Sequence, residues 1–437
     1  MGHIRYTYKK RWIVFCISLI DSVGYSVVNI LKRFKKPHPA PDYIKNILIF
    51  KLDHIGDVLM VTPALKFLKS RYRGASITVV VGSWSKDILK DNPDVDEILV
   101  YDAYWFNRNK GKKFNMKKTW RFIQEMRRKK FDIFYSFRGD FMGILIGAIL
   151  RIPIRIGFNN GGGGFLLTNS LTPLENAHQI EQFLYAVREN SFNIQFCPGD
   201  KDSRSYSYAE KRDNIGEDNL MRIVIAGEER RFADTFIKQY SIQSPLHPFK
   251  QGVVAPIRSM GRGIFVGFHM GAGYSSKLWI PEKYGILIKR LHEDFGIRAI
   301  LVGGEEDEAI IKRIQSIILD TGSMNSAGRT NIKETTALIE KCRLFIGNDS
   351  APVHIAAAVG VPVIVIFSAA NNPVGWKPFG KDVICITKDV PCRSCEKSEC
   401  VDTKCMRMVT VDEVYDKAKE ILMRTGEQKL KLNQRIQ

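Results

Sequence analysis

Short apolar runs alternate with longer amphipathic segments along most of the chain. Runs rich in Val, Ile and Phe that end at Gly, Asp or Asn are typical of buried strands in a parallel sheet. They fall into two series: NILIFKL (46–52), ASITVVVG (75–82), EILVYD (97–102) and FDIFYSF (131–137), then GIFVGFHM (263–270), IRAILVGG (297–304), RLFIGND (343–349) and VPVIVIF (361–367). Helical patterns lie between the runs. The alternation predicts an α/β fold built from two successive βα series.

The two series predict two domains. A chain of 437 residues, 45% of them hydrophobic, exceeds the size at which a single core usually splits. Residues 197–262 are polar and charged apart from the helical pattern EERRFADTFIKQY. We therefore predict a helix and linker over residues 1–43, a first domain with the interdomain connection over 44–262, and a second domain over 263–437.

The first apolar segment, from Trp12 to Leu31, predicts a helix long enough to span a bilayer. Polar residues at steps of one, three or four, with Asp21 in the middle, favour an amphipathic helix instead. Basic residues flank both ends, so no charge asymmetry orients a span. We expect a helix on the cytoplasmic face of the membrane, with a spanning helix and a helix packed on the protein as alternatives.

The net charge of +20 points to an anionic partner: nucleic acid, a membrane surface or an acidic substrate. Residues 105–138 hold twelve Lys or Arg and two acidic residues, which accounts for half of that charge. We expect no nucleic acid, because neither a helix-turn-helix pattern nor an aromatic stacking platform is evident.

Four of the eight cysteines lie close together, and no secretory signal is evident. Cys392, Cys395, Cys400 and Cys405 have a spacing that could hold zinc through four thiolates in a reducing compartment. Free or oxidisable thiols are the alternative.

Two segments of the first series carry candidate chemistry. In KLDHIGDVLMVTPAL a glycine precedes Asp57 where a strand gives way to a helix, so Asp57 could be a general base or could cap the helix. NNGGGG, at 159–164, predicts a mobile turn near a cleft or a plain surface loop.

The second series offers three candidate ligand sites. In HMGAGYSSKLWIPEKY, glycines, the hydroxyls of Ser275 and Ser276, and the charge of Lys277 suit a phosphate, although a tight turn with an exposed lysine has the same pattern. In LVGGEEDEAIIKRI, Glu306 or Asp307 could bind a ribose or could lie in a solvated helix N-terminus.

The third candidate is CRLFIGNDSAPVHIAAAVGVPVIVIF, where a strand ends at a carboxylate and a short helix begins. Asp349 and Ser350 could cap that helix. Capping does not account for His354 one turn further on, so we favour an anion site at the helix N-terminus.

In this order and spacing, the four segments resemble glycosyltransferase family 9, the ADP-heptose:lipopolysaccharide heptosyltransferases. The resemblance covers residues 44–420 or so and implies the GT-B architecture, two Rossmann-like domains facing across a cleft. It further implies inverting transfer of a heptose or related sugar from an ADP-sugar to a hydroxyl of an acidic lipopolysaccharide-core glycolipid. No cofactor or catalytic metal is implied.

The resemblance also assigns roles to residues. Asp57 matches the family's catalytic base, Lys277 its donor-phosphate lysine, and Asp349, Ser350, Ala351 and His354 its donor-binding loop. Ser350 and Ala351 stand where the family more often has Thr and Gly. The remaining predicted ligands are Ser275, Ser276, Glu306 and Asp307 for the donor, and Arg138, Asp140 and His178 for the acceptor.

An acidic glycolipid acceptor would explain both the basic segment and the membrane helix, so we expect a cytoplasmic protein, peripheral on the inner face of the membrane. Two alternatives stay open: a basic membrane- or RNA-binding adaptor, and a nicotinamide-dependent oxidoreductase. Against the oxidoreductase, GAGYSS lacks the third glycine of a dinucleotide fingerprint.

Overall fold

The computed structural model describes residues 11–34, 43–106, 115–189, 220–243 and 264–436, which form two compact units, 1–219 and 220–437. The Pro-containing linker and most of the polar 197–262 stretch lie outside these ranges. The second unit begins earlier than the predicted boundary at residue 263, because α8 (Gly227–Gln243) packs against α12 (Ile332–Glu340). Arg230 pairs with Glu340, and the Tyr240 hydroxyl donates to the Asn325 carbonyl at 3.1 Å.

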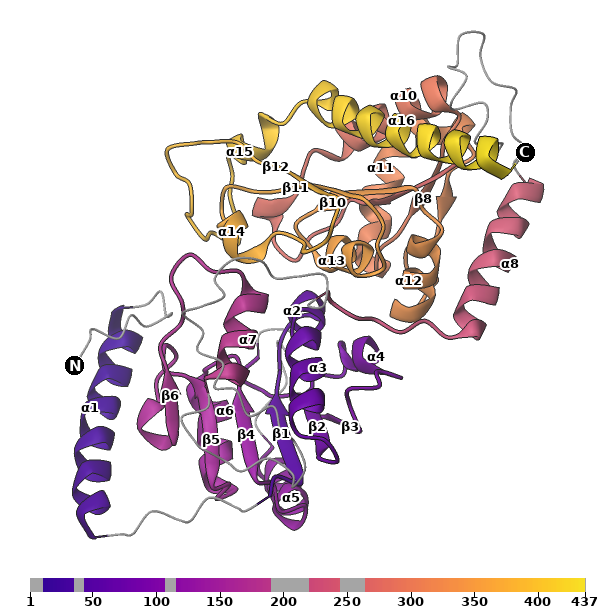
Figure 1. Ribbon diagram of the computed structural model, residues 1–437. Coiled ribbons are helices and arrows are strands. Elements are labelled where there is room, and N and C mark those ends of the chain that lie inside the picture. Colours follow the sequence, from indigo (N-terminus) through magenta and orange to yellow (C-terminus); the bar gives the residue numbers. More distant parts are fainter. Residues whose placement is uncertain (1–10, 35–42, 107–114, 190–219, 244–263, 437) are drawn as a thin grey trace. The chain divides into compact units, whose positions relative to one another are not determined.

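The first unit contains a six-stranded, all-parallel sheet in the order β3-β2-β1-β4-β5-β6 (Figure 1). Its strands are β1 (Asn46–Phe50), β2 (Ser76–Val81), β3 (Glu97–Val100), β4 (Ile133–Ser136), β5 (Ile154–Phe158) and β6 (Asn169–Leu171). Its helices are α1 (Arg11–Phe34), α2 (Ile55–Met60), α3 (Thr62–Arg71), α4 (Lys86–Leu89), α5 (Met116–Arg128), α6 (Phe141–Ile149) and α7 (Gln179–Arg188). The helical stretch after β1 is interrupted at Val61, two residues before Pro63 in the first turn of α3.

The second unit repeats this topology, with strand order β12-β11-β10-β7-β8-β9. Its strands are β7 (Phe265–His269), β8 (Arg298–Leu301), β9 (Met324–Asn325), β10 (Leu344–Asn348), β11 (Val363–Ile366) and β12 (Val383–Ile386). Besides α8 and α12, its helices are α10 (Pro281–Phe295), α11 (Glu308–Ile318), α13 (Ala351–Ala358), α14 (Pro373–Trp376), α15 (Lys404–Arg407) and α16 (Val411–Ile436). Each unit has the Rossmann strand order.

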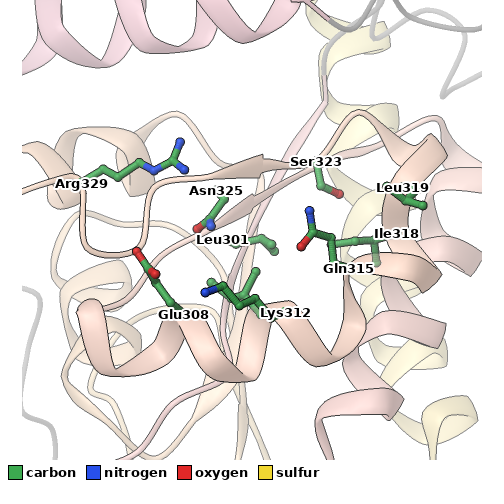
Figure 2. A pocket seen from close by; sticks show the side chains of 10 residues that line it. Leu301, Glu308, Lys312, Gln315, Ile318, Leu319, Ser323, Asn325 and Arg329 are labelled. Carbon is green, nitrogen blue, oxygen red and sulfur yellow. The ribbon is translucent and has the colours of Figure 1, made fainter.

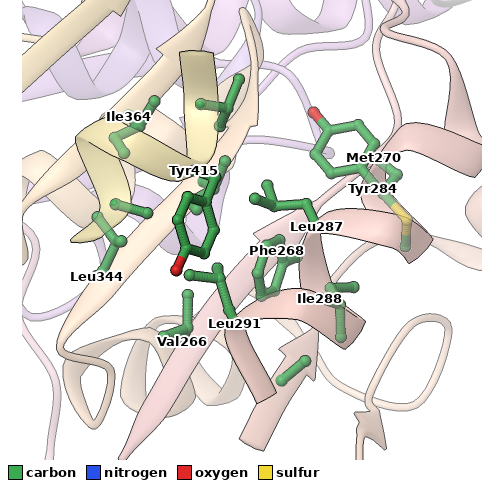
Figure 3. Close-up of a cluster of buried hydrophobic side chains, with 14 of the residues drawn as sticks. Val266, Phe268, Met270, Tyr284, Leu287, Ile288, Leu291, Leu344, Ile364 and Tyr415 are labelled. Atoms are coloured by element: carbon green, nitrogen blue, oxygen red, sulfur yellow. The ribbon is translucent and has the colours of Figure 1, made fainter. Parts of the chain in front are cut away.

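Apolar side chains of the second sheet pack against α10 and α16. Figure 3 shows Phe268 and Ile364 from the sheet beside Leu287 and Leu291 of α10, with Tyr415 of α16 closing the cluster; all are buried. The strands are apolar on both faces because helices cover both, so the predicted continuous runs are confirmed.

In the Rossmann order the chain first adds strands on one side of its first strand and then crosses over to add strands on the other side. The reversal point is the pair of adjacent strands between which this change of direction occurs. It lies between β1 and β4 in the first unit and between β7 and β10 in the second. In folds with this strand order, loops at the carboxyl ends of these strands diverge and ligands generally bind between them. The residues after β1, β4, β7 and β10 therefore include the candidates for chemistry.

Candidate active site

In the second unit, one buried amide holds the two loops at the reversal point together. Asn348, the last residue of β10, accepts hydrogen bonds from the Trp279 backbone N–H at 3.1 Å and from the Tyr284 hydroxyl at 3.0 Å. Its side-chain N–H groups donate to the carbonyls of Met270 and Gly271. The segment after β7 is thereby fixed beside the start of α13.

Lys277 and Asp349 meet across that junction. Lys277 Nζ lies 2.6 Å from Asp349 Oδ2, and the two side chains are 15% and 6% exposed. Asn371 donates to the same carboxylate oxygen at 3.1 Å. Two charged groups that are largely removed from water are stable only when they lie close to each other. The exposed-lysine interpretation is therefore wrong for Lys277, and Lys277 and Asp349 come together as predicted.

Ser350 is at the N-cap position of α13, but its hydroxyl makes no capping bond. It lies 2.8 Å from His269 Nδ1, and His269 Nε2 lies 3.3 Å from Asp307 Oδ2. The Ser350 hydroxyl donates to the Asn348 carbonyl at 3.1 Å, so it accepts from Nδ1–H when the imidazolium form of His269 donates from Nε2–H to Asp307. The ring thus links the helix N-terminus to the acidic segment after β8.

Protonation of Asp307 should change the free energy of unfolding. Burial by itself would raise its pKa, but the hydrogen bond and charge of His269 and the Gly304 N–H bring the pKa below the ordinary 3.8. A depressed folded-state pKa gives stability that is present above the unfolded-state pKa and lost as pH falls through the folded value.

We therefore expect the wild-type protein to lose unfolding free energy below about pH 4, and Asp307→Asn to lose less over that range. Chemical denaturation between pH 3 and 7 measures the difference. Glu306→Gln is the matched control because Glu306 is exposed. Parallel pH profiles for the wild type and Asp307→Asn would contradict the assigned ion pair.

The other predicted donor residues lie in different environments. Ser275 is exposed, whereas Ser276 is buried and its hydroxyl donates to the Lys397 carbonyl at 2.6 Å, which gives it a structural role. Ala351 begins α13 at intermediate exposure, and His354 is 5% exposed one turn further along. Sequence reasoning missed His269 and Asn348, each of which ends an apolar strand.

In the first unit the reversal point carries a charged cluster. Arg138, after β4, donates to the Leu52 carbonyl at 2.9 Å and lies 3.4 Å from Asp53, which also pairs with buried Lys51 at 2.8 Å. Arg138 Nε is 3.8 Å from Asp140 Oδ2. The structure thus joins predicted Arg138 and Asp140 to Lys51 and Asp53, which the sequence reasoning did not select.

Two predicted site carboxylates of this unit lie at the start of helices. Asp57 lies in the first turn of α2 at intermediate exposure. Asp140 caps α6 by accepting from the Gly143 N–H at 3.0 Å; burial raises its pKa, against the opposing charge of Arg138. His178 caps α7 in a reciprocal capping box with Glu181. Asp140 and His178 thus have defined structural roles.

Aromatic rings cover one side of the Arg138 cluster. Trp84 donates through its indole N–H to the Asp53 carbonyl and stacks on Phe106, with ring centroids 5.1 Å apart. Phe106 lies 4.7 Å from the Arg138 guanidinium and 5.1 Å from the His54 ring. No sequence motif marks these rings, because they come from different loops.

The predicted basic region is partly visible. Five basic side chains of α5 are exposed: Lys117, Lys118, Arg121, Arg127 and Arg128. Residues 107–114 lie outside the described ranges.

The four clustered cysteines do not converge in the described part of the chain, where no group of three or more Cys, His, Asp or Glu side chains could hold a metal ion. Cys392 is exposed, and Cys395, Cys400 and Cys405 are of intermediate exposure. Cys400 accepts from the Thr403 N–H, and Cys405 lies 3.8 Å from the Ser368 hydroxyl. This geometry favours the free-thiol interpretation.

A pocket of about 360 Å³ lies in the second unit along α11 and β9 (Figure 2). Its lining is Leu301, Glu308, Ile311, Lys312, Gln315, Ile318, Leu319, Ser323, Asn325 and Arg329. None of these was a predicted donor ligand, so this pocket is distinct from the Lys277–Asp349 junction.

Two Rossmann-like units, each with polar residues at its reversal point, define the GT-B class of glycosyltransferases. E. coli ADP-heptose lipopolysaccharide heptosyltransferase II has this fold, with a TM-score of 0.65 and 19% identity, covering 87% of this chain and 99% of that one. E. coli heptosyltransferase WaaC, solved with ADP, matches with a TM-score of 0.57 and 15% identity, covering 86% of this chain and 99% of that one.

The sequence comparisons give the family. The family model for glycosyltransferase family 9 (heptosyltransferase) matches residues 119–406, and the chain belongs to that family. Lipopolysaccharide heptosyltransferase 3 of E. coli is 25% identical over 334 residues, which cover 75% of this chain and 85% of that protein. The resemblance inferred from the motifs is confirmed, and glycosyl transfer replaces the adaptor and oxidoreductase alternatives.

Proposed function

We propose that this glycosyltransferase moves a heptose or related sugar from an ADP-sugar to a hydroxyl of an acidic lipopolysaccharide-core glycolipid, with inversion at the anomeric carbon. The observation that carries the donor half is the Lys277–Asp349 pair at the start of α13. A cation and a helix N-terminus in one place suit a diphosphate. The solved relative that contains ADP supports adenosine as the nucleoside.

The proposed chemistry is a single displacement. Asp57 takes the proton of the acceptor hydroxyl as that oxygen bonds to the anomeric carbon, and the bond from this carbon to the diphosphate breaks. ADP leaves with the electron pair, and Lys277 offsets the charge that develops on it. No electrons are exchanged with a redox group, so no redox cofactor is needed. We propose that Lys277 supplies the positive charge that a catalytic metal would otherwise provide, so that no metal is required.

Arg138 and the exposed basic residues of α5 supply positive charge for an acidic acceptor. We propose that Asp140 and His178 shape this acceptor region through the helices they cap. The enzyme would act in the cytoplasm, on the inner face of the cytoplasmic membrane, where its lipid-linked acceptor is accessible.

Thermal shift with nucleotide sugars tests the donor assignment. We expect ADP-linked sugars to raise the melting temperature by several degrees at saturating concentration, because a ligand that binds only the folded state stabilises it. UDP-sugars, GDP-sugars and NAD are the matched competitors and should have little effect. Stabilisation by NAD alone, or by a UDP- or GDP-sugar alone, would contradict the proposal.

Product analysis then tests the reaction. NMR of the transferred sugar should show the anomeric configuration opposite to that of the donor, and the rate should be unchanged by a chelator. Retention of configuration, or loss of activity that added metal restores, would contradict the single displacement without a metal.

A further inference from the structure

The N-terminal helix α1 is docked on the first unit through a buried carboxylate. Asp21 is 3% exposed, and its Oδ1 accepts a hydrogen bond from the Gly163 N–H at 2.8 Å. Tyr25 packs edge-on against Phe165, with ring centroids 6.0 Å apart. Figure 1 shows α1 running alongside this unit. The polar centre of the segment therefore faces protein.

The opposite face of α1 is apolar and exposed. Val23 follows Asp21 by two residues, which is about 200° around a helix. Leu19 and Val23 are 58% and 57% exposed. The rest of the exposed apolar surface is Trp12, Phe15, Ile20, Val27, Ile30 and Leu31. Such a contiguous stripe on a soluble domain marks an interaction surface.

Exposed hydroxyls form a strip beside the apolar stripe. Ser22 and Ser26 are exposed, and each donates to the carbonyl four residues earlier. The helix thus has a docked face, an apolar face and a polar flank, whereas the sequence placed Asp21 and the serines on one polar face.

The loop that receives Asp21 also contacts the candidate acceptor segment. Gly161 forms a parallel bridge with Asp140, and a side chain at Gly161 would lie 2.2 Å from the Gly139 carbonyl. Gly162 and Gly163 have φ angles of +85° and +80°, a region that favours glycine. Residues 161–164 are buried, so the prediction of an exposed surface loop is wrong.

We propose that α1 lies in the plane of an anionic phospholipid leaflet, held between the bilayer and the first unit, with Asp21 as the latch that fixes the membrane surface relative to Arg138 and Asp140. The acceptor part rests on the proposed function, whereas membrane docking does not. The segment Trp12–Leu31 is long and apolar enough to cross a bilayer. Crossing would require Asp21 to leave Gly163 and enter hydrocarbon, which is costly.

Charge in the sequence selects the anionic leaflet as the partner. Lys9, Lys10 and Arg11 precede the apolar stripe, and Lys32, Arg33, Lys35 and Lys36 follow it. Basic residues at both ends of an apolar face match an interfacial helix on acidic lipids. A second copy of this chain, with the same basic flanks, would bring like charges together.

Vesicle flotation of the full chain tests the docking. We expect binding to vesicles of phosphatidylglycerol and phosphatidylcholine, with much weaker binding to phosphatidylcholine alone or in high salt. Leu19→Gln with Val23→Gln should weaken binding roughly 100-fold, because two apolar side chains no longer enter the bilayer. Ser18→Gln with Ser22→Gln, on the polar flank, should change it less than about 3-fold.

Alkaline carbonate should release the wild type from membranes, since an in-plane helix is not a span. The proposal would be overturned if the protein stayed in the membrane pellet, if it did not bind vesicles, or if the two double variants had equal effects. It would also be overturned if Leu19→Gln with Val23→Gln dissociated a dimer and left vesicle binding unchanged.

The latch is tested separately. Asp21→Ala should retain vesicle binding but increase hydrogen exchange at residues 161–164, and Asp21→Asn should restore protection because its amide oxygen can accept from Gly163. If the proposed function holds, Asp21→Ala lowers transfer to a membrane-embedded acceptor several-fold and leaves transfer to a detergent-dispersed acceptor unchanged. Equal loss on both acceptors, or unchanged exchange, would overturn the latch. Lack of transfer by every variant would count against the proposed function alone.

Discussion

Asp57→Asn should lower the turnover number roughly 10²- to 10⁴-fold, the range expected when a positioned general base is removed. In the proposed inverting displacement the acceptor hydroxyl approaches opposite the leaving ADP, so the base should come from the unit that binds the acceptor, which we propose is the first unit. Asp57 meets that requirement, because it lies in the first turn of α2 in the first unit. Steady-state kinetics with saturating donor measures the change.

Donor affinity and thermal stability should remain near wild type in Asp57→Asn, because the amide preserves shape. Asp140→Asn is the comparison, since Asp140 caps α6 and pairs with Arg138. We expect that variant to lose stability with a smaller loss of turnover. The reverse pattern, with stability lost at Asp57 and turnover lost at Asp140, would move the base to Asp140.

Lys277→Ala should weaken donor binding by roughly 30- to 5000-fold, since the variant loses the charge pair between the lysine and the diphosphate, and truncating one member of a desolvated charge pair costs about 2–5 kcal/mol. Lys277 and Asp349 are 2.6 Å apart and largely buried, so removal of either leaves the other without its partner ion. Asp349→Ala should therefore weaken donor binding as well, through disruption of the loop before α13. Calorimetry with ADP reports both effects.

The double variant distinguishes a shared role from two separate ones. If the pair acts as a unit, Lys277→Ala combined with Asp349→Ala should cost less than the sum of the single changes. Lys283→Ala is a control, because Lys283 donates to the carbonyls of Arg407 and Val409. Unchanged ADP affinity in both single variants would exclude this diphosphate site.

The strands of both sheets were predictable because their signal is local. Each buried parallel strand must be apolar on both faces and must end where the chain turns, so runs such as VPVIVIF can be recognised as strands from the sequence. The boundary between the units was less predictable. Residues 220–243 join the second unit through contacts such as Arg230–Glu340, which link positions 110 residues apart.

Some residues of the candidate site could be selected from the sequence, and others could not. Asp57, Lys277, Asp349 and Ser350 were selected because each lies in a recognisable motif at the junction between a strand and the helix that follows it. His269 and Asn348 were missed because they end apolar strands, where their polar side chains give no periodic signal. Trp84 and Phe106 were missed because their stacking joins separate loops.

The sequence by itself determined the α/β class, the duplicated βα series, the family and the order of its motifs, because these depend on periodicity and on residues close together along the chain. Only the tertiary structure decided what each polar group contacts. In the folded chain Ser350 hydrogen-bonds His269, Ser276 hydrogen-bonds Lys397 and Asp21 hydrogen-bonds Gly163. A hydrogen bond depends on distances of about 3 Å between atoms, and for residues 81, 121 and 142 positions apart the folded chain alone sets them.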